Sequence, residues 1–208
     1  MPDLSSSAIP PLTLPDTPAD LAPPNRHRWS PRAFHDKPVP PDALRTLLEA
    51  ARWAASCFNE QPWRFILATK DQPQQYAQLL GILAPKNQLW AKAAPVLLLS
   101  VAKTTFSHNA KPNRHGIHDT GAAAATLCIQ AAALGLQAHS MAGFDAAKAR
   151  ELFQIPADFD PAAAIALGYP APPDAAPEEF RAAESAPRTR KPLSDLVFTT
   201  TWGTPADL

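Results

Sequence analysis

Polar side chains lie at a predicted junction between a helix and a strand, in the segment Ser56–Trp63 (SCFNEQPW). Ser56, Asn59 and Gln61 can each donate and accept hydrogen bonds. A plain connection is more often built from Gly, Asp or Pro. The segment therefore predicts either a surface that hydrogen-bonds a polar ligand or a structural turn anchored by a buried Trp63. Its residue types alone leave both interpretations open.

Arginines gather near both ends of the chain. Arg26, Arg28 and Arg32 surround Ser30, and a second cluster follows at residues 188–191 (RTRK). Guanidinium groups suit the bidentate binding of phosphate oxygens. Each charge-assisted hydrogen bond contributes about 1.5–3 kcal/mol, so the two clusters together could hold a dianionic phosphate. The alternative is two solvated basic patches that never meet, and the charge pattern does not decide between them.

Hydrophobic patterns predict the elements that position these groups. Continuous apolar segments at 65–69 and 95–101 predict strands, the second of them central, and shorter segments at 137–140 and 162–167 predict two more. Helical spacing predicts one helix that opens at Pro40-Pro41-Asp42 and another around Tyr76–Leu83. Asp145 is a predicted N-cap for a helix over 146–154. These elements indicate an α+β class with a small sheet between helices.

The longest predicted helix runs from Gly116 to Leu134 and is apolar on nearly every side, with Gly135 as its C′ residue. Such a helix must be enclosed by protein, and its small side chains allow another helix to approach closely. We expect Ala123 and Ala124 to take part in a contact between subunits.

Composition limits the class of protein. A chain of 208 residues with zero formal net charge is expected to fold as one domain, with neither nucleic acid nor membrane as a partner. Two cysteines without a CxxC pattern favour a reducing, cytoplasmic setting, and the N-terminus does not resemble a secretory signal. Prolines concentrate in residues 1–25, which we expect to form an extended arm before a single domain at 26–208. A second proline- and alanine-rich stretch, 170–187, is expected to be a surface connector.

Several motifs, in order along the chain, resemble the nitroreductase family of FMN-dependent NAD(P)H oxidoreductases. The resemblance spans residues 26–203. The motifs are Arg28-x-Ser30-x-Arg32-x-Phe34, the stretch 54–65 (AASCFNEQPWRF), Asn87-Gln88-x-Trp90 together with His118-Asp119-x-Gly121, the stretch 141–145 (MAGFD) and Arg188-x-Arg190-Lys191-Pro192-Leu193.

The resemblance implies a fold and a cofactor site. The fold would be nitroreductase-like, with a small, mostly antiparallel central sheet enclosed by helices, in an intertwined homodimer with the flavin at the interface. The phosphate of FMN would be bound by two clusters, Arg28, Trp29 (through its backbone), Ser30 and Arg32 at one end and Arg188 and Arg190 at the other. Ser56, Cys57 and Asn59 would reach the flavin of the other subunit, Asn87 would bond its pyrimidine edge, Asp119 would lie near the ribityl chain or ring, and Met141, Ala142 and Gly143 would form the loop beside N5.

The resemblance also implies a reaction. Hydride would pass from NADH or NADPH through flavin N5 to a small acceptor such as a nitroaromatic or quinone, in ping-pong order, with no catalytic side chain because the flavin carries the chemistry. Ala142 stands where some members carry Glu, so the choice of nucleotide does not carry over. The alternative function is a flavin-binding or storage protein without turnover.

Other residues have less specific interpretations. His115 and His118 are spaced i, i+3 near Asp119, but without further ligands nearby we expect no metal site. Cys57 is expected to be a small packing residue rather than a reactive thiol. Trp53, Trp63 and Trp90 are expected to be core anchors rather than flavin stackers.

Overall fold

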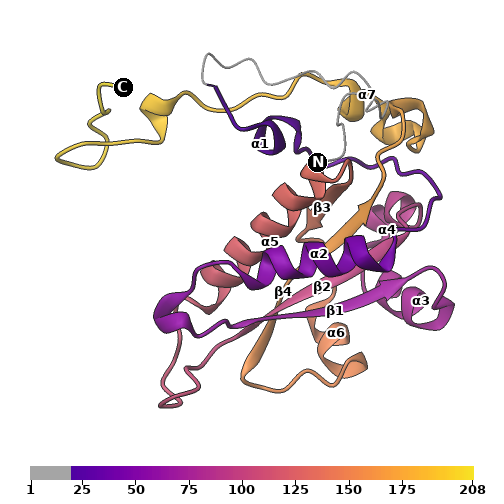
Figure 1. The fold of residues 1–208 in the computed structure, drawn as a ribbon, viewed down its shortest axis with the longest axis horizontal. Coiled ribbons are helices and arrows are strands. Elements are labelled where there is room, and N and C mark those ends of the chain that lie inside the picture. The colour runs from indigo at the N-terminus through magenta and orange to yellow at the C-terminus, as the bar shows by residue number, and fades with distance from the viewer. Residues whose placement is uncertain (1–19) are drawn as a thin grey trace.

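The centre of the fold is a four-stranded antiparallel sheet with the strand order β1-β2-β4-β3 (Figure 1). The computed structural model describes residues 20–208, so most of the expected proline-rich arm lies outside the described residues. The strands are β1 (Trp63–Thr69), β2 (Val96–Lys103), β3 (Gln137–Met141) and β4 (Phe159–Gly168). All four predicted strands are confirmed, and the α+β class with them.

Strand β2 is an inner strand of the sheet, and its side chains are buried on both faces. Alternate side chains of a strand point to opposite faces. Leu97, Leu99 and Val101 accordingly join one apolar cluster, whereas Val96 and Leu98 join another. The continuous apolar sequence of this strand is therefore explained by two cores, one on each side of the sheet.

One face of the sheet is covered by α2 (Pro41–Arg52) and α5 (Gly116–Ala133), which pack against each other (Figure 1). The cluster on the other face includes residues of α3 (Pro73–Gly81), α4 (Pro85–Ala91) and α6 (Ala146–Leu152). Proline begins α2, α3 and α4, because the first helical position needs no N–H donor. Asp145 caps α6 as predicted: its Oδ1 accepts a hydrogen bond from the Lys148 N–H at 2.9 Å. Gly135 has a φ of 72° directly after α5, as a C′ residue requires.

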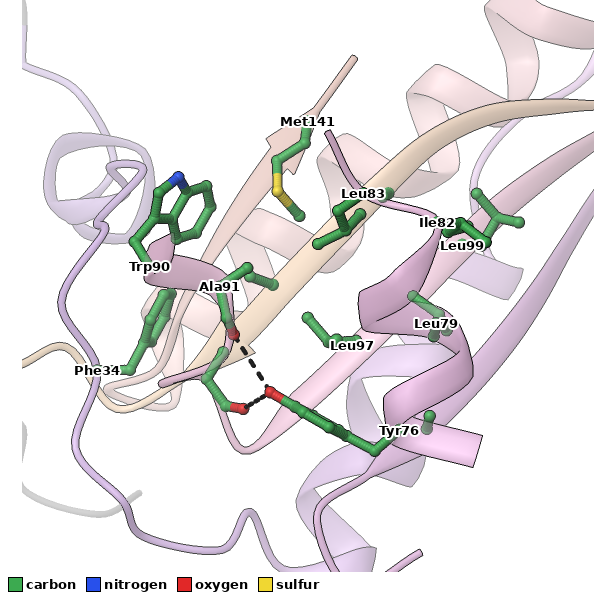
Figure 2. Close-up of a cluster of buried hydrophobic side chains, with 14 of the residues drawn as sticks. Phe34, Tyr76, Leu79, Ile82, Leu83, Trp90, Ala91, Leu97, Leu99 and Met141 are labelled. Carbon is green, nitrogen blue, oxygen red and sulfur yellow. Dashed lines mark hydrogen bonds between the residues drawn. The ribbon is translucent and has the colours of Figure 1, made fainter. Parts of the chain in front are cut away.

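Figure 2 shows this cluster, with Trp90 and Phe34 at one side and the Tyr76 hydroxyl directed toward the backbone of Ala91. The Tyr76 hydroxyl donates to the carbonyl oxygens of Ala91 and Ala94 at 3.2 and 2.6 Å, which ties α3 to the end of α4. Burial raises the pKa of Tyr76 well above its ordinary value.

The remaining elements are short. They are α1 (Pro23–His27), α7 (Glu178–Ser185) and three 3-10 turns at Cys57–Asn59, Pro173–Ala175 and Leu193–Asp195. The last part of the chain extends away from the body of the protein (Figure 1). No helix among residues 20–208 is long and apolar enough to cross a membrane.

Several expectations about these elements need correction. The stretch 170–187 is not a plain connector, because it contains α7, which buries Phe180 and Glu184. Residues 23–25 belong to α1 instead of an extended arm, and α4 was not predicted. Trp53 is 76% exposed, so it is not a core anchor, whereas Trp63 and Trp90 are buried as expected.

The side of α5 that faces outward is also not the side that was predicted. Ala123 is fully buried in the core of its own chain, because α2 and the sheet cover that side of the helix. The exposed stripe consists of Ile117, Gly121, Ala125 and Ile129, spaced four residues apart.

Candidate functional site

A cavity of about 640 Å³ lies between α5 and the sheet. Its volume falls within the range of small-molecule and cofactor sites. It extends along α5 from Ile117 to Ile129, roughly 18 Å at 1.5 Å per residue. Arg28, Ser30 and Asn25 line it from the N-terminal segment. On the helix and strands, Ile117 and Ile129 are large, and the other lining residues are small: Ser100, Gly121, Ala124, Ala125, Cys128, Ala138, Ser140, Ala162 and Ala163.

The two arginine clusters meet beside this cavity. The Arg188 guanidinium donates through Nη1 to the carbonyl oxygen of Arg28 and through Nη2 to that of Arg26, both at 2.7 Å. Burial lowers the pKa of Arg188, and the positive charges of Arg28 and Arg190 lower it further. The positive charge of Arg188 is therefore disfavoured where it stands, and an anion bound nearby would relieve that cost.

Arg188 departs from its predicted role in one respect. Two of its donors bond backbone carbonyls of the N-terminal segment, so it fastens the two ends of the chain together. Arg190 is exposed, and its Nη1 donates to the carbonyl oxygen of Thr189 at 2.7 Å. Arg28 and Ser30 are the predicted phosphate-binding residues that line the cavity itself.

Two other members of the N-terminal cluster are engaged elsewhere. Arg32 does not line the cavity, and its Nη1 lies 3.5 Å from Oε1 of the buried Glu184. The Trp29 N–H donates to Oε1 of Gln137 at 3.0 Å, so a side chain already occupies this donor, and the backbone contact from Trp29 to a phosphate stays a prediction. In both cases the partner lies far away in the sequence, an ion-pair carboxylate for Arg32 and a hydrogen-bond acceptor for Trp29.

Gln137 and His139 are polar residues of β3 that the sequence analysis missed. Gln137 is 1% exposed, and its Nε2 donates to the carbonyl oxygen of His27 at 3.1 Å. The His139 Nδ1–H donates to the carbonyl oxygen of Pro31 at 2.9 Å, and its ring lies on Trp90 with centroids 4.4 Å apart. The signal was present, because two polar residues at alternate positions of a predicted strand share one face.

The structure brings together the predicted flavin-ring residues Asn87 and Gly143. The Asn87 Nδ2 donates to the carbonyl oxygen of Gly143 at 2.9 Å. A Cβ at position 143 would lie 2.7 Å from that nitrogen, so a side chain at this position would have to displace the Asn87 amide. Ala142 is exposed beside them, whereas the Met141 side chain is buried in the core.

The segment from Ser56 to Gln61 is a strained loop. Phe58, Asn59 and Gln61 have φ values of 54°, 53° and 51°, a left-handed conformation that non-glycine residues rarely adopt. Ser56 Oγ accepts from the Gln61 N–H at 3.0 Å and so closes the loop. Such strain persists only where surrounding contacts hold it, and it is concentrated at functional sites.

Asp119 anchors this loop to α5. Its carboxylate is buried, and Oδ2 accepts a hydrogen bond from the Cys57 N–H at 2.9 Å, while Oδ1 lies 3.0 Å from the exposed His118 ring. A residue beside the ribityl chain would be expected to line the cavity, and the Asp119 side chain does not line it. Ser56, Cys57 and Asn59 do not line the cavity of their own chain either.

Comparison with known proteins is consistent with this geometry. The family model described as "Nitroreductase family" matches residues 26–169. A putative NADH dehydrogenase/NAD(P)H nitroreductase of Stenotrophomonas maltophilia is 31% identical, over 65% of this chain and 78% of that protein. An NADH dehydrogenase of Thermus thermophilus is 27% identical, over 82% of this chain and 91% of its own length.

Solved structures share the fold. An oxidoreductase described as containing FMN superposes with a TM-score of 0.85 at 36% identity, over 91% of this chain and 96% of that chain. A nitroreductase family protein of Clostridium difficile 630 superposes with a TM-score of 0.68 over 88% of this chain and 99% of its own, and at 24% identity it shows the fold alone.

The chain belongs to the nitroreductase family. Its class of enzyme is the nitroreductase-type flavin oxidoreductase, and its fold is the one that the family resemblance implied.

Proposed function

We propose that this protein is an FMN-dependent NAD(P)H oxidoreductase that reduces a small acceptor such as a nitroaromatic or a quinone. The observation that carries the proposal is that Arg28 and Ser30 line a cavity of cofactor size, while Arg188 bonds the backbone of the same segment. The similarity to an FMN-containing oxidoreductase and to a putative NAD(P)H nitroreductase supports the same assignment.

The residues of the cavity fit FMN. The cationic end suits a phosphate dianion, and Ser30 can donate a further hydrogen bond there. The walls contributed by Gly121, Ala124 and Ala163 carry little side-chain bulk, which suits a flat aromatic ring. Bound FMN supplies the chemistry, because its ring accepts hydride from a nicotinamide and passes it to the acceptor.

The protein's own contribution is binding and orientation. Arg28 and Ser30 hold the phosphate end. Asn87 does not line the cavity of its own chain, but its bond to Gly143 fixes the amide that would contact the pyrimidine edge of the ring. Donors near that edge stabilise the negative charge that develops there on reduction. No side chain of this set transfers a proton in the proposed reaction.

A second copy of the chain completes the proposed site. The exposed stripe of α5 (Ile117, Gly121, Ala125 and Ile129) also lines the cavity, so one wall is an apolar surface facing outward. The loop 56–61 does not reach the cavity of its own chain. In the proposed homodimer, this loop from the partner closes the cavity over the flavin.

Titration of the apoprotein with flavins tests the proposal. FMN should bind much more tightly than riboflavin, and NADH or NADPH should bleach the visible absorbance of the bound flavin under anaerobic conditions. Bound flavin that neither nucleotide reduces would indicate a storage protein instead. An apoprotein that binds neither flavin would refute the cofactor assignment.

Substitution of two arginines refines the test. Arg28→Ala should weaken FMN binding at least tenfold, because Arg28 lines the cavity. Arg32→Ala should weaken it less than threefold, because Arg32 is paired with Glu184 and does not line the cavity. Isothermal titration with FMN measures both, and an equal loss from the two variants would contradict the assigned geometry.

A further inference from the structure

The segment 26–31 carries the cavity residues Arg28 and Ser30, and within the described residues 20–208 no strand pairs with it. Farther along, residues 33–35 pair with 169–171 through backbone hydrogen bonds, His35 N to Tyr169 O and Ala171 N to Ala33 O. Buried or half-buried backbone groups need partners. The groups of residues 26–31 therefore have to be satisfied by something other than a neighbouring strand.

Side chains supply those partners from β3. Gln137 accepts from the Trp29 N–H and donates to the carbonyl oxygen of His27, and His139 donates to that of Pro31. An amide is the side chain that can do both, because it has an acceptor and a donor side by side. Only one orientation of the Gln137 amide fits, since the flipped amide would place its NH₂ against the Trp29 N–H.

The pattern of these bonds sets which side chains face the cavity. The bonds from β3 fall on odd-numbered residues, 27, 29 and 31, and Trp29 and Pro31 are buried. The even-numbered Arg28 and Ser30 line the cavity, and Arg188 bonds the even-numbered carbonyls of residues 26 and 28. The backbone becomes extended at Arg28, directly after α1, and from there a shift by one residue would exchange the two sets, as it does in an extended strand.

We infer that Gln137 and His139 are positioning residues for FMN binding. They hold the segment 27–31 in the register that directs Arg28 and Ser30 to the phosphate. The inference rests on the proposed function, because it takes the cavity to be the FMN site. Neither residue lines the cavity, so each acts through the segment it holds.

The experiment compares binding of FMN and riboflavin to apoproteins by quenching of flavin fluorescence. Gln137→Met keeps the length of the side chain but removes both hydrogen bonds. The ratio of riboflavin Kd to FMN Kd should fall at least tenfold, while riboflavin Kd should change less than threefold, because only FMN uses the phosphate site. Gln75→Met, on the exposed side of α3, is the matched control and should leave the ratio unchanged.

A general loss of structure would weaken both flavins alike, so an unchanged ratio in Gln137→Met overturns the inference. His139→Phe is the second variant, which keeps a ring on Trp90 but removes the donor to Pro31. His139→Phe should lower the ratio of riboflavin Kd to FMN Kd severalfold. If Gln137→Met does not fold, His139→Phe alone tests the inference. A parent protein that does not prefer FMN to riboflavin would instead refute the proposed function, which separates the two failures.

Discussion

The bond between Asp119 and the loop 56–61 yields a quantitative prediction. Asp119→Ala removes a buried carboxylate that accepts from the Cys57 N–H at 2.9 Å. A hydrogen bond to a charged group contributes about 1.5–3 kcal/mol. The neighbouring His118 side chain is 79% exposed, so that ion pair adds little. We therefore expect the free energy of unfolding to fall by about 2–3 kcal/mol.

The assay has two parts. Urea unfolding gives the change in stability, and hydrogen exchange at the Cys57 amide reports the loop itself, with an expected rise in opening of roughly 30-fold for about 2 kcal/mol. Asp119→Asn keeps an acceptor and should lose only about 1 kcal/mol. Asp207→Ala, at an exposed position, is the control and should stay within about 0.5 kcal/mol.

The reasoning would be refuted by an Asp119→Ala protein with parental stability and unchanged exchange at Cys57. That result would mean that other contacts, such as the bond from the Gln61 N–H to Ser56 Oγ, suffice to hold the left-handed residues. Lost stability with unchanged loop exchange would place the role of Asp119 in α5 rather than in the loop.

Three further predictions concern single buried contacts. Burial lowers the pKa of His139 to about 4. Between pH 4 and 6.5 the unfolded chain therefore binds more protons than the folded chain, so stability falls as the pH falls through that window. His139→Phe should remove about 3 kcal/mol of this loss of stability between pH 7 and 4, measured by urea unfolding at each pH. Gly143→Ala should displace the Asn87 amide and lower stability by about 1 kcal/mol, whereas Gly81→Ala, with open space around it, should not destabilise the protein. Tyr76→Phe should lower the thermal midpoint by an amount equivalent to about 1–2 kcal/mol, and an unchanged midpoint would show that its two bonds are not needed.

The elements of this fold could be predicted from the sequence where their signals are local. The apolar segment of β2, the long alanine-rich α5 with Gly135 after it, and the Asp145 cap each lie within a short window of the chain. Helix α4 was missed because its seven residues are too few for a clear helical period. Trp53 was misplaced because residue type alone does not show that α2 ends just before it and leaves its ring exposed.

The chemistry of the candidate site was also in the sequence by itself, since the arginine clusters and the order of the motifs predicted an anionic cofactor and the family. Only the tertiary structure decided which donors remain for a ligand. Glu184 pairs with Arg32, Gln137 takes the Trp29 N–H, and Arg188 bonds the backbone of the N-terminal segment. The physical reason is that a donor's availability depends on which acceptors folding brings within about 3 Å of it, and these acceptors lie more than a hundred residues away along the chain.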